Sequence, residues 1–124
     1  MNLSNKGTLL HGKLNLAIYT LGHLVGKIEP VSLRQLAVDS GCSVSYLEQT
    51  FCLLLKANIV TSTRGPGGGY MLSDITGTKT SVRSIVLAID SETFSQCRNN
   101  KLYQHLEEAM GYITLAEATA SNQD

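Results

Sequence analysis

Apolar residues recur at intervals of three and four along the first half of the chain, the spacing of one helix face. The first such segment is Leu9–Val25, and the next begins at Ser32, where Ser-Leu-Arg-Gln has the form of a capping box. Gly41 ends this second helix, and Ser43 or Ser45 caps a third. The apolar face expected on the third helix comprises Val44, Leu47, Phe51, Leu54 and Leu55. Two short helices joined by a tight turn predict a helix-turn-helix.

The pattern then changes from helical spacing to two short segments rich in β-branched and apolar residues. These are NIVTSTR and GYML, with GPGGG between them, and they predict a β-hairpin. Three helices followed by a hairpin form a winged helix-turn-helix. We therefore expect a mainly α fold with a small β-hairpin wing, in which residues 1–75 form a winged helix-turn-helix DNA-binding domain. The polar face of the second helix of the motif would enter a DNA major groove.

Amphipathic helices are also predicted in the second half of the chain. TSVRSIVLAID predicts a short helix, and NKLYQHLEEAMGYI predicts a longer one. The apolar row of the longer helix comprises Leu102, Leu106, Met110 and Ile113. A small winged domain cannot cover this row, so the expected mate is the same helix of a second subunit. The alternative is packing onto the first helix of its own chain. Residues 76–124 are thus expected to form a linker helix and a C-terminal dimerisation helix.

The segment STRGPGGGYML between the two predicted strands allows more than one interpretation. A phosphate-binding loop needs a Lys and a Ser or Thr opening a helix, whereas Tyr70 and a strand follow here. A plain hairpin needs one or two glycines with positive φ, and this segment has four glycines and a proline. The surplus favours a wing whose backbone approaches DNA, with Arg64 reaching a narrow minor groove.

Charge is unevenly distributed along the 124 residues, although the net charge is zero. Residues 1–72 carry six Lys and Arg against three Asp and Glu, a net +3, and residues 73–124 carry four against seven, a net −3. A basic first half is compatible with nucleic acid. No apolar run is long enough to span a membrane and no signal peptide is evident, so we expect a cytoplasmic protein. The histidines lack catalytic partners in the sequence, which argues against an enzyme.

The segments SVSYLEQTF and TRGPGGGYML together resemble the Rrf-two family of bacterial winged-helix regulators, over nearly the whole chain. The likeness is greatest to the members that bind an iron–sulfur cluster. The resemblance implies a homodimer that binds a palindromic operator in double-stranded DNA and represses or activates transcription. On this basis, the positions that match DNA-contacting residues of the family are Ser45, Glu48, Gln49, Arg64, Pro66 and Gly67. The full set that we expect to contact DNA also includes Ser43, Tyr46, Lys56 and Gly65.

The chemistry of the third helix agrees with this assignment but leaves Glu48 open. Gln49 can pair with adenine, and the Glu48 carboxylate can accept from the cytosine amino group. Ser45 and Glu48 also fit a capping box, in which Glu48 only caps the helix.

The family commonly has arginine where this chain has Thr8 and Leu53. Losing two cations weakens non-specific DNA affinity.

The cluster-binding members carry three cysteines and a histidine between the last two helices, and this chain keeps only Cys97 there. His11 could share a cluster with Cys97 across a dimer, but clusters normally take four protein ligands, mostly thiolates. We therefore expect no cofactor, with an iron–sulfur cluster of incomplete ligand set as the alternative. Cys97 beside Arg98 could instead be a redox-sensing thiol. A second hypothesis for the whole chain is a redox-sensing or protein-interaction module with this fold and weak DNA binding.

Overall fold

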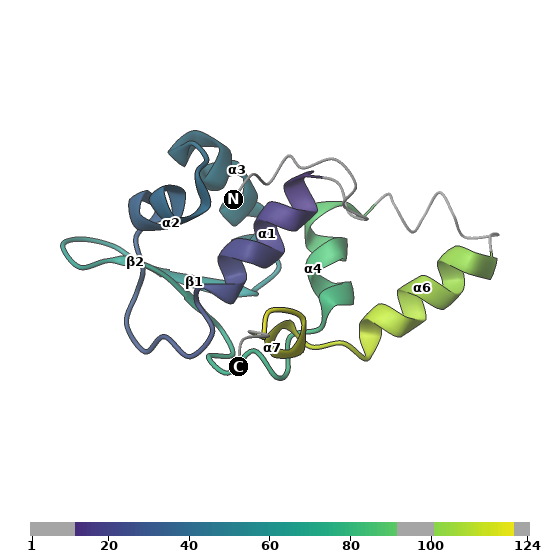
Figure 1. Cartoon of the computed structure of the whole chain (residues 1–124). Coiled ribbons are helices and arrows are strands. Elements are labelled where there is room, and N and C mark those ends of the chain that lie inside the picture. The colour runs from purple at the N-terminus through teal and green to yellow at the C-terminus, as the bar shows by residue number, and fades with distance from the viewer. Residues whose placement is uncertain (1–11, 92–100, 121–124) are drawn as a thin grey trace.

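The structure, a computed structural model, describes residues 12–91 and 101–120. These residues are mainly helical and include one two-stranded antiparallel hairpin, as the sequence predicts (Figure 1). The first five elements in chain order are α1 (Gly12–Gly22), α2 (Leu33–Ser40), α3 (Val44–Lys56), β1 (Val60–Thr63) and β2 (Gly69–Leu72). They are followed by α4 (Val82–Ile89), α6 (Lys101–Gly111) and α7 (Leu115–Ala118).

Local capping defines the helix-turn-helix formed by α2 and α3. The Ser32 hydroxyl accepts from the Gln35 amide at 3.1 Å, and Gly41 ends α2 in the left-handed conformation with φ of 72°. The capping box predicted at Ser32 forms only by half. The Gln35 side chain donates instead to Asp39 Oδ1 at 2.9 Å. Ser43, one of the two candidates, caps α3 by accepting from the amide of Tyr46.

The first helix is shorter than predicted at its C-terminal end. It ends at Gly22 rather than Val25, because the next amides bond three residues back: Leu24 N–H donates to Leu21 O at 2.9 Å. The chain then turns at Gly26, whose amide donates to Ile75 O. The predicted start at residue 9 lies outside the described residues.

The buried face of α3 differs from the predicted one. Leu47, Phe51 and Leu54 are buried as expected. Val44 and Leu55 are exposed, because they lie at the edges of the stripe that faces the core. Thr50 is buried in that stripe, since its hydroxyl donates to Tyr46 O at 3.2 Å and so has a hydrogen-bond partner.

The core draws residues from both halves of the chain. The buried face of α4 is the one predicted, and it packs against α1 and α3. Its residues are Val82, Ile85, Val86 and Ile89. Helix α7, which the sequence reasoning missed, adds the fully buried Leu115 beside α1. Thr114 and Glu117 form a complete capping box there, so a sequence signal for α7 exists.

Helix α6 extends from the helical body at the end opposite the hairpin loop (Figure 1). It packs against α4 rather than α1, which was the intramolecular alternative. Met110 contacts the core, and Arg83 of α4 donates two hydrogen bonds to Glu107 Oε2, at 2.7 and 3.0 Å. The other residues of the predicted apolar row are exposed: Leu102 by 64%, Leu106 by 38% and Ile113 by 40%. Ile113, predicted on the same helix, lies beyond the end of α6 at Gly111. The residues that the structure describes therefore leave most of this row uncovered.

The residues that follow the C-terminal end of α6 are hydrogen-bonded to the N-terminal end of α4. Ser81 and Thr114 form an isolated antiparallel bridge, and Val82 N–H donates to Ile113 O at 2.8 Å. The preceding loop is ordered by Asp74, whose carboxylate accepts from the Lys79 amide at 2.7 Å and from the Thr76 hydroxyl. These hydrogen bonds lower the pKa of Asp74, and the bond from the Lys79 amide has the largest effect.

In the described parts of the chain, no helix is long and apolar enough to cross a bilayer.

Candidate nucleic-acid interface

One face of α3 is polar and exposed from end to end. Ser45, Glu48, Gln49, Cys52 and Lys56 are all exposed, and each lies three or four positions from another member of this set. This spacing places them on one side of the helix. Leu47, Phe51 and Leu54 on the other side anchor the helix in the core. The core contacts thus fix the orientation in which α3 presents this row.

The cap geometry excludes the capping role that was left open for Glu48. Ser43 is the N-cap, and the amide bonded to its hydroxyl belongs to Tyr46, the third residue of the helix. Glu48 lies beyond the first turn, so the alternative capping box from Ser45 to Glu48 does not form. The Glu48 side chain is exposed on the polar face, where a carboxylate can accept from a base.

The hairpin ends in a tight turn at its exposed tip. The Gly68 amide donates to Gly65 O at 2.9 Å, which closes a four-residue turn with Pro66 and Gly67 at its centre. Proline followed by a glycine with φ of 75° is typical of a type II turn. Arg64 precedes the turn, and residues 64–67 are exposed. The tip therefore presents a guanidinium beside unobstructed backbone.

The fold accounts for all four glycines, three through the hairpin itself and Gly69 also through its contact with Val31. Gly65 and Gly67 have positive φ, as does Gly69 at 151°. A Cβ on Gly68 would lie 2.2 Å from Thr63 O, and one on Gly69 would lie 2.3 Å from Val31 O. The inference that four glycines exceed what a hairpin needs is therefore wrong. The case for a DNA-contacting wing rests on Arg64 and the exposed tip.

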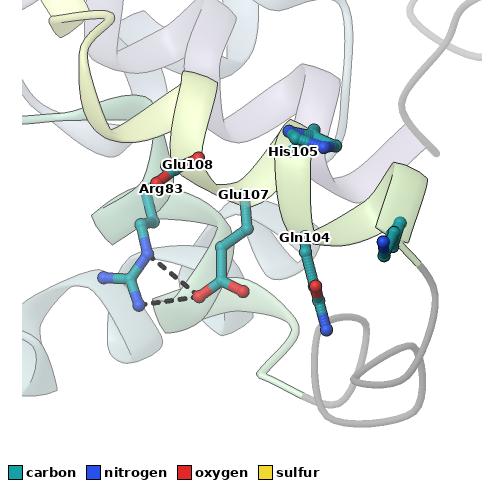
Figure 2. Close-up of a pocket in the computed structure, with 6 residues that line it drawn as sticks. Arg83, Gln104, His105, Glu107 and Glu108 are labelled. Carbon is teal, nitrogen blue, oxygen red and sulfur yellow. Dashed lines mark hydrogen bonds and ion pairs between the residues drawn. The ribbon is translucent and has the colours of Figure 1, made fainter.

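A hollow lies away from this surface, on α6. It has a volume of about 460 Å³ and is lined by Arg83, Lys101, Gln104, His105, Glu107 and Glu108. Figure 2 shows Arg83 pointing to Glu107, with which it forms the ion pair between α4 and α6. All six lining residues of the hollow are polar or charged, whereas small-molecule sites are lined mainly by hydrophobic and aromatic side chains.

The described cysteines do not assemble a metal site. Cys42 is half-buried with its Sγ 3.1 Å from Ser40 Oγ, and Cys52 is exposed on α3. Residues 12–91 and 101–120 contain no group of three or more His, Cys, Asp or Glu able to hold a metal ion. Cys97 and His11 lie outside the described residues. With one further thiol in the sequence, the donor set of a single chain does not fit a cluster held by four protein ligands.

Comparison with known proteins adds the following findings. A family model described as Rrf2, iron-dependent transcriptional regulator, matches residues 10–121. The HTH-type transcriptional regulator IscR of Serratia proteamaculans is 34% identical over 112 residues, covering 77% of this chain and 67% of that protein. The structure of T. potens IscR is similar with a TM-score of 0.75 at 27% identity, covering 95% of each chain.

A further likeness concerns the fold alone. CymR, the global cysteine regulator of B. subtilis, has a TM-score of 0.76 at 21% identity, covering 94% of this chain and 99% of that one. The similarity therefore extends beyond the winged domain to the C-terminal helices.

Proposed function

This chain belongs to the Rrf2 family of transcriptional regulators and is of the IscR type, and we propose that it binds a palindromic DNA operator as a homodimer. Helix α3 enters the major groove and the wing lies along the adjacent minor groove. The observation that carries the proposal is the continuous exposed polar face of α3, held by a buried opposite face. As in IscR, the activity is regulation of transcription rather than catalysis.

The side chains of this face suit direct base readout. Gln49 has the amide that pairs with adenine in two hydrogen bonds, and Glu48 has the acceptor for the cytosine amino group. Ser43 and Ser45 lie at the start of α3, where amides and hydroxyls contact phosphates. Lys56 in the last turn adds a cation for the backbone. The helix thus combines base contacts with contacts that position it.

The wing supplies the second contact. Arg64 suits a narrow minor groove, whose negative potential attracts guanidinium groups. Gly65, Pro66 and Gly67 form a tip without bulky side chains, so their backbone can approach phosphate oxygens. Tyr46 is exposed in the first turn of α3 and completes the proposed contact set.

The dimer is proposed on the uncovered apolar row of α6. Leu102 and Leu106 are exposed in the single chain, and burying them against a second copy removes apolar surface from water. A twofold dimer presents two copies of α3 to two half-sites, which makes the operator palindromic. Repression or activation then depends on where the operator lies relative to the promoter.

We propose that the regulator works without a resident iron–sulfur cluster, although the family description includes iron dependence. The support is the donor set, in which Cys97 is the one thiol outside the helix-turn-helix. His11 is the residue that a shared, mixed-ligand site would recruit. In the absence of a cluster, oxidation of Cys97 beside Arg98 is the proposed sensing chemistry.

Replacing Arg64 with alanine tests the proposed function. The operator is first selected from a random DNA pool with the wild-type protein, and binding isotherms are recorded at fixed salt. We expect Arg64→Ala to lose about 1–3 kcal/mol of operator affinity, because a minor-groove contact is removed. Lys79→Ala is the control, since it removes the same charge from the loop that follows the wing. Equal affinities for wild type and Arg64→Ala would instead favour a redox-sensing or interaction module that binds DNA weakly.

The exposed thiol of Cys52 offers an independent probe of α3. Because Cys52 lies on the row with Gln49 and Lys56, a maleimide adduct there would block major-groove docking. We expect N-ethylmaleimide to reduce operator affinity by more than the roughly 1–3 kcal/mol that one mismatched base pair costs. Bound operator should also slow the labelling of this thiol, followed by mass spectrometry. Cys52→Ser should resist the loss, and full-strength binding by protein labelled at Cys52 would exclude docking through this face.

A further inference from the structure

Recognition by α3 and the wing together requires a fixed distance between them, because each element reads a different groove of one site. The wing is a two-stranded hairpin, and such hairpins are marginally stable unless they are packed against other elements. The contacts that hold the hairpin against α3 therefore decide whether Arg64 reaches its groove when α3 is docked.

Tyr70 of β2 lies at the junction of three chain segments. Its backbone faces Ser62 of β1 in the antiparallel register. On its other side it forms an isolated bridge with Val31, whose carbonyl accepts from the Tyr70 amide at 2.8 Å. The Val31 amide in turn donates to Tyr70 O at 3.0 Å. The strand position of Tyr70 is thus fixed from both edges.

The side chain of Tyr70 extends the junction to the recognition helix. Its ring meets the ring of Phe51 edge-on, with the centroids 5.0 Å apart and the planes at 64°. This geometry is one of the preferred arrangements of aromatic pairs. Phe51 is fully buried and follows Gln49 by two positions, so it belongs to the part of α3 that carries the proposed reading residues. The ring pair therefore links the wing directly to that turn of α3.

We infer that Tyr70 is a positioning residue for DNA recognition, and the inference rests on the proposed function. Its ring sets the wing against α3 so that Arg64 enters the minor groove when Glu48 and Gln49 meet the major groove. Tyr70 acts through Arg64 and is not itself placed on the DNA. Losing the ring should uncouple the wing from α3 and make the Arg64 contact ineffective.

A double-mutant cycle distinguishes this role from a merely structural one. Operator isotherms are measured for the wild type, Arg64→Ala, Tyr70→Leu and the double variant, each below its unfolding temperature. We expect Arg64→Ala to cost about 5–150-fold in the wild-type background but less than about twofold in the Tyr70→Leu background. Tyr70→Phe keeps the ring pair and should restore the full effect of Arg64→Ala.

The cycle also separates the possible failures. An equal cost of Arg64→Ala in both backgrounds would mean that Tyr70 only fills space, which overturns the inference and leaves the proposed function intact. If Arg64→Ala binds the operator as tightly as the wild type, Arg64 does not contact DNA, and both proposals fail. If Tyr70→Leu does not fold, Phe51→Leu removes the same ring pair from the α3 side and enters the cycle in its place, with the same two expectations.

Discussion

Replacing Leu106 with glutamate is expected to convert the protein from a dimer to a monomer and to lower operator affinity about 10²–10⁴-fold. Leu106 is exposed in the centre of the apolar row of α6, so the substitution leaves the core of the single chain unchanged. Two like charges would meet at a twofold interface, where an unpaired buried charge is strongly unfavourable. Sedimentation equilibrium gives the mass, and titration of the selected operator gives the affinity.

Gln104→Glu is the matched control for this variant. It adds the same charge to the same helix, and the helical repeat of 3.6 residues places position 104 on roughly the opposite side from the apolar row. The control should remain dimeric and bind the operator as the wild type does. A Leu106→Glu protein that stays dimeric and binds with unchanged affinity would exclude this row as the dimer interface.

Replacing Gly69 with alanine is expected to lower the free energy of unfolding by about 2–5 kcal/mol, the combined cost of backbone strain and lost hydrogen bonds. The added Cβ would lie 2.3 Å from Val31 O, a backbone atom that cannot rotate away. The φ of 151° is also one that residues with a side chain rarely adopt. We therefore expect β2 to separate from Val31 and the wing to lose its anchor. Urea unfolding followed by circular dichroism measures the change.

Gly67→Ala separates the contact with Val31 from conformational strain. Gly67 also has positive φ, but a Cβ there meets nothing within 4 Å. Only the left-handed strain applies, so we expect a loss of about 1–2 kcal/mol. Losses of equal size at positions 67 and 69 would mean that the close approach to Val31 contributes nothing. Similar slopes of the two unfolding curves are required for the comparison.

Local signals in the sequence predicted the helix-turn-helix well. The caps at Ser32 and Ser43 and the left-handed turn at Gly41 depend on neighbours within a few residues, so the sequence pattern identifies them. The buried face of α4 was likewise predictable from helical spacing, and the exposed row on α3 was expected at the same positions that the structure exposes. The roles of those residues in DNA contact remain predictions.

The features that sequence reasoning missed depend on contacts between distant segments. The need for glycine at position 69 comes from Val31, far earlier in the chain, so counting glycines in the loop could not identify it. Thr50 is buried because its hydroxyl bonds the backbone of its own helix, which a binary apolar pattern does not register. The four residues of α7 are too few for a periodic signal, although Thr114 and Glu117 mark its start.

Helix α6 is attached to α4 near its C-terminal end. The attachment consists of the bridge between Ser81 and Thr114 and the ion pair between Arg83 and Glu107, so α6 can tilt about the N-terminal end of α4. At 1.5 Å per residue, its eleven residues span about 16 Å, so a tilt of about 10° displaces the far end by ~3 Å. In the proposed dimer, such a displacement alters the separation of the two α3 helices. Half-sites lie about 34 Å apart along the duplex. The tilt of α6 relative to α4 thus determines which half-site spacings the proposed dimer can bind.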